Sequence, residues 1–189
     1  YDMILCGKNK TRDTINNRII YDIIGKKSLN PFIGAKVVNR QNNWDLAIKG
    51  ISLTNGLVGY ITNLSKRKSY MGYYTIDFRP DFMDDEFEDL KIDCKYMISN
   101  YEVRKNYGLC KFEKFEYAYC ITTHISQGSQ YNKVLFFDEP FADAETTKKL
   151  RYTAITRAMD SITIVRSPKS YTSRTLWNSE AYNNYRRNY

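Results

Sequence analysis

The strongest constraint on the fold is an alternation of apolar strands and a helix in the last third of the chain. Residues 117–122 are a strand candidate, and residues 134–137 form the continuous apolar run typical of a strand buried on both faces. Residues 144–158 have helical spacing, and residues 161–165 are a further strand candidate. This order predicts a parallel sheet whose strands are joined by right-handed crossovers.

The opening residues predict one more strand and helix of the same sheet. Residues 3–6 have a buried-strand pattern, and apolar residues recur at helical spacing over residues 11–24 before Gly25 provides a stop. The chain begins inside this strand pattern without the features of a signal peptide, so we expect a piece of a longer protein. For the tail after residue 170 we expect a short helix or a frayed end.

Between these parts the apolar pattern changes to short strands separated by turns. Strand candidates cover residues 35–38, 44–48, 57–61 and 73–78, and Asn55-Gly56 predicts a hairpin or another tight turn. We expect the acidic run 81–89 to form a solvated turn or short helix. The predicted fold class is α/β, with a parallel-sheet lobe of residues 1–34 and 116–189 interrupted by a small β-barrel of residues 35–115.

Composition excludes several classes of protein. The chain has 189 residues, 42% of them hydrophobic and 26% charged, which is typical of folded domains. No apolar run approaches the ~18 residues of a membrane span, so we expect no membrane association. The four cysteines are scattered without a CxxC pair, which predicts neither a zinc site nor a disulfide scaffold and favours a reducing, cytoplasmic location.

The net charge of +8 favours a polyanionic partner such as nucleic acid. However, the sequence is rich in Lys, Asn, Ile and Tyr, as AT-rich coding would produce. Charge alone therefore leaves the partner open.

Two sequence blocks carry most of the chemical information. The first, residues 119–129 (YCITTHISQGS), places hydroxyls, an imidazole and an amide after a strand, where open α/β sheets bind ligands. Within it, Gly128 lets backbone N–H groups approach a phosphate. The second, residues 150–158 (LRYTAITRA), presents Arg157 among small and hydroxyl residues, where a fixed guanidinium can meet phosphate bidentately.

These blocks resemble known helicase motifs. Residues 122–129 and 152–158 are similar to motifs V/Va and VI of superfamily 1 helicases. Residues 115–119 (FEYAY) and 4–12 (ILCGKNKTR) resemble the RecD/Dda branch, the latter at motif IV, and residues 34–59 resemble the start of its SH3-like insertion. The resemblance implies a RecA-like second motor lobe that is interrupted by an SH3-like β-barrel.

The family builds its motor from two RecA-like lobes with ATP between them and single-stranded DNA across both. The resemblance therefore implies ATP and Mg²⁺ as cofactors, bound mainly by a P-loop lobe that these residues lack. It makes Arg157 the arginine finger, which stabilises charge on the transferred phosphoryl group. The other implied nucleotide-site residues are Gln127, Gly128, Asn9, Lys10 and Arg12.

The implied partners are single-stranded DNA, the P-loop lobe of the same protein, and other replication or recombination proteins. The expected DNA contacts are Thr122, His124 and Asn55, although Asn55 is first of all a turn residue and a lone His is often structural. Trp44, Tyr60 and Tyr73 could stack on bases or belong to the core.

Residues 134–139 (VLFFDE) look like a Walker B strand, but no G-x-x-x-x-G-K-[ST] motif occurs, so we interpret Asp138 and Glu139 as a strand end. The missing P-loop also argues against an intact small ATPase. A non-catalytic nucleic-acid-binding module remains the alternative, and a P-loop encoded upstream of Tyr1 would favour the motor.

Overall fold

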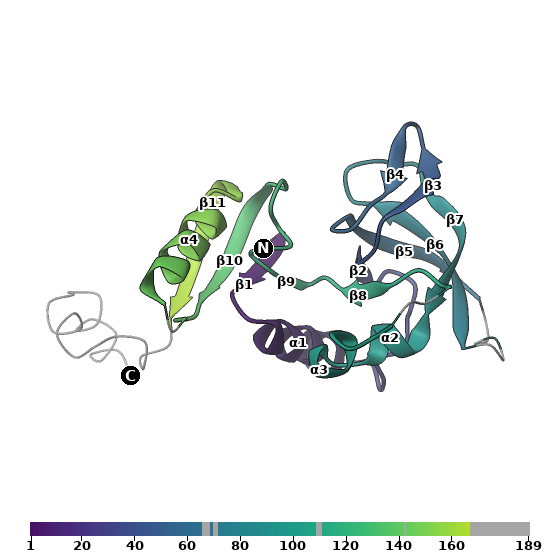
Figure 1. Ribbon diagram of the computed structural model, residues 1–189, viewed down its shortest axis with the longest axis horizontal. Helices are drawn as coiled ribbons and strands as arrows, with labels where there is room; N and C mark the ends of the chain where they lie inside the picture. The colour runs from purple at the N-terminus through teal and green to yellow at the C-terminus, as the bar shows by residue number, and fades with distance from the viewer. Residues whose placement is uncertain (66–68, 70–71, 109–110, 142, 167–189) are drawn as a thin grey trace, which may run out of the picture.

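A computed structural model describes residues 1–65, 69, 72–108, 111–141 and 143–166. It contains a parallel sheet and an antiparallel sheet that lie beside each other, and a small two-stranded hairpin (Figure 1). Our expectation for the tail after residue 170 lies outside the described residues.

The parallel sheet has the strand order β11-β10-β1-β9. Its strands are β1 (Met3–Cys6), β9 (Cys120–Thr122), β10 (Tyr131–Asp138) and β11 (Ala158–Arg166). Leu5 of β1 is in register with Phe136 of β10 and Ile121 of β9, and all three side chains are buried in one core cluster. The predicted parallel sheet, including the strand at residues 3–6, is confirmed.

Two helices connect these strands. α1 (Asn9–Arg18) continues into a π-helical turn, η1 (Ile19–Ile23), and Gly25 follows with a φ of +76°. Glycine adopts this left-handed conformation without strain, so the predicted stop is confirmed. α4 (Ala144–Ile155) precedes β11, and its N-cap Asp143 accepts hydrogen bonds from two backbone N–H groups of the first turn.

The intervening residues form a five-stranded antiparallel sheet with the order β7-β6-β5-β2-β8. Its strands are β2 (Lys36–Asn39), β5 (Val58–Leu64), β6 (Tyr73–Pro80), β7 (Phe87–Asp93) and β8 (Phe115–Tyr117). The hairpin strands are β3 (Asn43–Ile48) and β4 (Ile51–Leu53), and the short helices are α2 (Cys94–Ile98) and α3 (Tyr101–Arg104). A second core cluster includes Ile61, Phe78 and Phe115.

One local prediction is confirmed and another needs correction. Asn55-Gly56 forms a tight turn, as predicted, with Gly56 at φ +94°, and the two-residue hairpin lies at Lys49-Gly50, where both φ values are positive as in a type I′ turn. Our interpretation of the acidic run is wrong at its end. Phe87 begins strand β7 and faces the core, because its apolar side chain outweighs the surrounding acidic residues.

The predicted strand 117–122 is divided between the two sheets. Tyr117 ends β8, and only Ala118 and Tyr119 separate it from β9. Val38 and Val58 of the antiparallel sheet pack into the core cluster of the parallel sheet, so the two sheets share an apolar contact. Among the described residues, no helix has the length and apolar character needed to cross a membrane.

Candidate nucleotide and nucleic-acid site

A loop of residues 123–130 runs from the carboxyl end of β9 back to the amino end of β10. Its backbone is fixed by hydrogen bonds, since the N–H of Thr123 donates to the carbonyl of Cys6 (2.9 Å) and that of Ser129 donates to the carbonyl of Ser126 (3.0 Å). Gly128 has a φ of +87°, which a residue with a side chain adopts at a cost. The loop therefore holds its polar side chains in defined positions.

Arg157 lies between α4 and β11, against this loop. Its Nη1 donates to the carbonyl of Ser129 (3.0 Å), its Nε to the carbonyl of Thr153 (3.3 Å), and its Nη2 to the hydroxyl of Thr156 (3.2 Å). Among the described residues, no carboxylate lies within ion-pair distance of this half-buried guanidinium. Within this part of the chain, the charge is thus positioned by neutral acceptors and not by an acidic side chain.

The predicted contact residues of the loop and of β9 differ in accessibility. His124, a predicted DNA contact, and Gln127, a predicted nucleotide contact, are exposed on the loop, whereas Thr122, a predicted DNA contact at the end of β9, is only 6% exposed. In this conformation His124 can meet a ligand directly, and Thr122 cannot.

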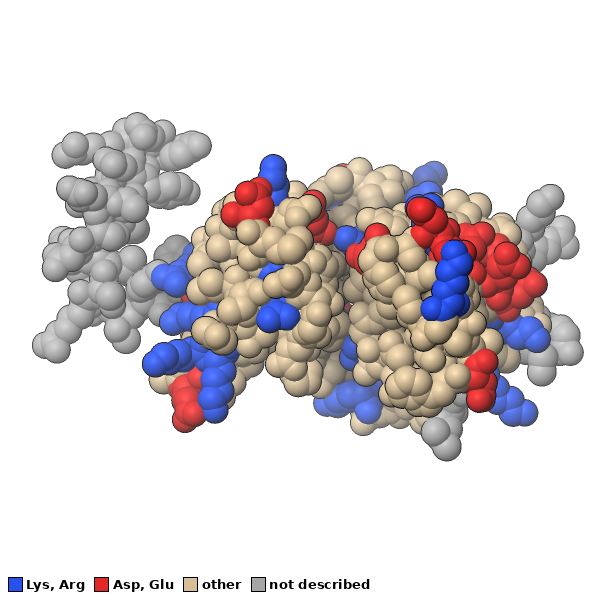
Figure 2. Space-filling model, turned by 90° about the horizontal axis from the view of Figure 1, so that it is seen from above, with Lys and Arg blue, Asp and Glu red and all other residues tan. Residues whose placement is uncertain are grey.

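The Asn55-Gly56 turn lies next to the same loop. A Cβ atom on Gly56 would be 3.9 Å from the carbonyl oxygen of Ile125. A groove of about 300 Å³ separates the two segments and is lined by residues that include Gly56, Phe82 and Gly128. Figure 2, which looks down on this side, shows a hollow between the two halves of the molecule, with basic and acidic side chains interspersed around it. The structure therefore brings the Asn55 turn and the loop together.

Asn9 and Lys10 lie elsewhere, in the first turn of α1 beyond the carboxyl end of β1. Arg157 lies at the amino end of the sheet, where its carbonyl accepts a hydrogen bond from the N–H of Tyr131 (2.8 Å). The eight residues of β10 span roughly 25 Å at the rise of a β-strand. Arg157 and the α1 residues therefore cannot contact one phosphate group together.

Arg12 has a different environment from the one we expected. Its guanidinium is 2% exposed and pairs with Glu116 (2.8 Å) and Asp13 (3.0 Å). Burial would lower the pKa of Arg12, but the two carboxylates outweigh it and raise the pKa. Because its donors already face these carboxylates inside the protein, Arg12 is a structural residue and not a phosphate contact.

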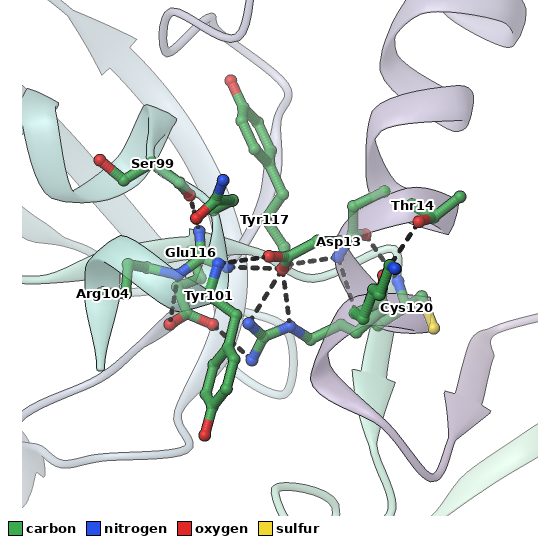
Figure 3. A network of polar contacts seen from close by, with 12 residues as sticks. Asp13, Thr14, Ser99, Tyr101, Arg104, Glu116, Tyr117 and Cys120 are labelled. Atoms are coloured by element: carbon green, nitrogen blue, oxygen red, sulfur yellow. Dashed lines mark hydrogen bonds and ion pairs between the residues drawn. The ribbon is translucent and has the colours of Figure 1, made fainter. Parts of the chain in front are cut away.

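Arg12 belongs to a buried polar network that the sequence reasoning missed (Figure 3). Glu116 of β8 also pairs with Arg104 of α3 (3.2 Å) and with Arg40 after β2 (3.5 Å), and it accepts a hydrogen bond from the hydroxyl of Tyr96 (3.1 Å). Burial, followed by the proximity of Glu116, raises the pKa of Tyr96 to about 12. A charged residue inside the apolar stretch 115–121 was the signal that could have indicated this network.

Asp138 is the last residue of β10, as expected for a strand end. It is buried and pairs with Arg151 (2.9 Å) and Arg166 (2.5 Å). The described residues contain no group of three or more His, Cys, Asp or Glu side chains that could hold a metal ion.

The sequence matches the family of UvrD-like helicase C-terminal domains over residues 117–165. This segment is less than half of the chain, and it contains the loop 123–130, α4 and Arg157. No curated protein matches the sequence.

Solved structures of Pif1 helicases have a similar fold. The Bacteroides Pif1 helicase in complex with ADP-AlF3 and single-stranded DNA is 18% identical, with a TM-score of 0.53 over 99% of this chain and 44% of that one. Pif1 from Candida albicans is 13% identical, with a TM-score of 0.54 over 98% of this chain and 48% of that one. A structure of two coordinating Pif1 helicases at forked double-stranded DNA is 20% identical, with a TM-score of 0.55 over 99% and 44%.

The chain thus spans less than half the length of these solved helicases. Its mixed α/β fold, with a parallel and an antiparallel sheet, is that of a helicase RecA-like lobe. At this level the predicted fold is confirmed.

Proposed function

We propose that this chain is the C-terminal, motor-completing part of a superfamily 1 DNA helicase of the RecD/Dda type. Residues 1–34 and 116–189 would form the second RecA-like lobe, and residues 35–115 its SH3-like insertion. The whole protein would use ATP to translocate along single-stranded DNA and to unwind duplex.

The environment of Arg157 carries the proposal. A guanidinium that serves only as a structural ion pair would face a carboxylate, as that of Arg12 does. That of Arg157 is instead held by carbonyl and hydroxyl oxygens, so its charge remains available to an anion. The adjoining loop adds Gln127 and the backbone of Gly128, which fit a phosphate group.

In the complete motor, ATP and Mg²⁺ would be held mainly by the P-loop lobe. The metal-bound phosphates supply the phosphoryl group to be transferred. Arg157 would reach that group across the cleft and stabilise its negative charge, which is the role of an arginine finger. Single-stranded DNA would contact His124 and the Asn55 turn, with Thr122 behind them. Contacts of Asn9 and Lys10 with a ligand at the opposite edge of the sheet stay a prediction.

The test uses the natural protein with both lobes. We expect Arg157→Ala to lower DNA-stimulated ATP turnover by about 10³-fold or more, and Arg157→Lys nearly as much, because an ammonium cannot span two phosphate oxygens. DNA affinity and the melting temperature should stay close to those of the parent. Arg18→Ala, which removes an exposed guanidinium that pairs with Asp22 one turn further along, is the matched control and should leave turnover unchanged.

Near-normal turnover by a stably folded Arg157→Ala protein would refute the arginine-finger assignment. A natural protein without a P-loop upstream of Tyr1 would favour the non-catalytic nucleic-acid-binding module.

A further inference from the structure

The groove between the Asn55-Gly56 turn and the loop 123–130 contains an exposed aromatic ring that the proposed chemistry leaves unused. Phe82 lies in the turn that follows β6, lines this groove and is 60% exposed, although its side chain is apolar. The backbone of this turn is tied to the antiparallel sheet, because the N–H of Asp81 donates to the carbonyl of Val58 (3.1 Å). The ring is therefore presented to the groove from a defined position.

A second residue of the groove carries a polar group without a partner. Tyr131, the first residue of β10, lines the groove and is only 8% exposed. Its hydroxyl is buried, and no described residue forms a hydrogen bond of good geometry with it, although Ser129 and Arg157 lie near it. Burial raises the pKa of Tyr131, so the hydroxyl keeps its proton at neutral pH. Because an unsatisfied buried hydroxyl is costly, this donor favours a ligand that brings an acceptor into the groove.

The walls of the groove favour a flat, uncharged group over a phosphate. Gly56 and Gly128 have no side chains, so a planar ring can approach the backbone on both sides of the groove. The carboxylate of Asp81 also lines the groove and repels phosphate there. The volume of about 300 Å³ is at the lower end of that of ligand pockets, which suits one small ring system.

We propose that this groove is a pocket for one unpaired nucleobase of single-stranded DNA, in which Phe82 stacks on the base and the Tyr131 hydroxyl donates a hydrogen bond to its edge. Aromatic side chains bind bases with little sequence preference, because every base has a π face. The strand on either side of this base would contact His124 and the Asn55 turn. The inference rests on the proposed DNA binding, and it applies to the motor and to the non-catalytic module alike.

The test measures the affinity of the chain for two labelled strands of equal length: oligothymidylate, and an abasic strand that has the same phosphates but no bases. Fluorescence anisotropy is recorded at one fixed salt concentration, because phosphate contacts depend on salt. ATP binding is measured in parallel. The variants are Phe82→Ala, Phe82→Tyr, Tyr131→Phe and the control Tyr152→Ala, which removes an exposed aromatic ring from α4.

We expect Phe82→Ala to bind oligothymidylate about tenfold more weakly than the parent and to bind the abasic strand equally well. Phe82→Tyr keeps the ring and should bind both strands like the parent. Tyr131→Phe should bind oligothymidylate about fivefold more weakly. Its melting temperature should nevertheless equal or exceed that of the parent, because the substitution removes a hydroxyl that has no partner in the free protein. Tyr152→Ala should match the parent with both strands.

A parent that binds both strands with equal, measurable affinity would overturn the base pocket and leave the proposed DNA binding in place. So would a stably folded Phe82→Ala protein that binds oligothymidylate like the parent. If that variant lost affinity for ATP instead, the groove would belong to the base of the nucleotide. A parent that binds neither strand would overturn the proposed DNA binding together with the pocket.

Discussion

Replacement of Glu116 by Gln should strongly destabilise the protein, although it changes almost nothing in side-chain volume. Glu116 is 4% exposed and faces Arg12, Arg40 and Arg104. Gln retains one acceptor oxygen but removes the negative charge. Asp13 would then be the remaining carboxylate beside Arg12 and Arg104.

The distances set the size of the effect. At an effective dielectric constant of about 20, unit charges 2.8 Å apart, as in the pair with Arg12, attract each other by roughly 6 kcal/mol before desolvation is considered. Breaking a buried pair typically costs about 3–5 kcal/mol, because it leaves an uncompensated buried charge. We expect the free energy of unfolding to fall by about 3 kcal/mol or more. Because folded proteins are only marginally stable, this loss is a large fraction of the whole free energy of unfolding.

Urea denaturation followed by circular dichroism measures the loss. Glu145→Gln is the matched control, because it breaks an exposed pair with Lys149 and should change the midpoint little. A second substitution, Arg104→Met, should restore part of the stability of Glu116→Gln, because it removes one of the two cations that would then share the single carboxylate of Asp13. A Glu116→Gln protein within 1 kcal/mol of the parent would refute the view that this network is held by charge.

Three further predictions follow from the geometry. His124→Ala should weaken binding of labelled single-stranded DNA about fivefold in fluorescence anisotropy, while the parent's affinity falls steeply with salt; tight binding that ignores salt would contradict this. Stability should fall between about pH 10 and pH 12, because an unfolded Tyr loses its proton near pH 10 whereas the raised pKa keeps Tyr96 protonated in the folded state. Tyr96→Phe should flatten this loss in urea midpoints, and an unchanged slope would exclude Tyr96 as its cause. Gly59→Ala should cost about 3 kcal/mol or more, because its Cβ would lie 2.1 Å from the carbonyl oxygen of Arg79; Gly108→Ala, with nothing within 4 Å, is the control, and equal midpoints would refute the clash.

The parallel sheet could be predicted because its strands are short, apolar and separated by a periodic helix. The run that contains Val134 and Phe136 lies in the middle of the sheet, and these two side chains are buried in its core cluster, whereas Leu135 and Phe137 on the other face are only half-buried. The antiparallel unit was harder to predict because pairing between residues that are distant in sequence decides its conformation more than the local propensity of each residue does. Lys49 adopts a positive φ that its own side chain disfavours, and Phe87 joins a strand from within an acidic run.

The candidate site was predictable in part for a similar reason. Arg157 and Gln127 belong to the two sequence blocks that were singled out from their residue types. In the structure the two segments contact each other, since Arg157 donates a hydrogen bond to the carbonyl of Ser129 in the loop that contains Gln127. Arg12 was misassigned because the chain position of a guanidinium does not reveal which carboxylates surround it. Glu116, its nearest partner, is about a hundred residues away in sequence.

The short connection between β8 and β9 has a mechanical consequence. The chain enters the antiparallel unit through residues 24–35, but it returns to the parallel sheet across only Ala118 and Tyr119, both well packed. Any tilt of the antiparallel unit is thus passed almost directly to Thr122 and the loop that follows. Added residues should be tolerated in the entering segment, where residues 21–28 are exposed. One extra residue between β8 and β9 would instead turn the side chains of β9 to the opposite faces of the sheet, so that a tilt of the antiparallel unit would no longer be passed to the loop.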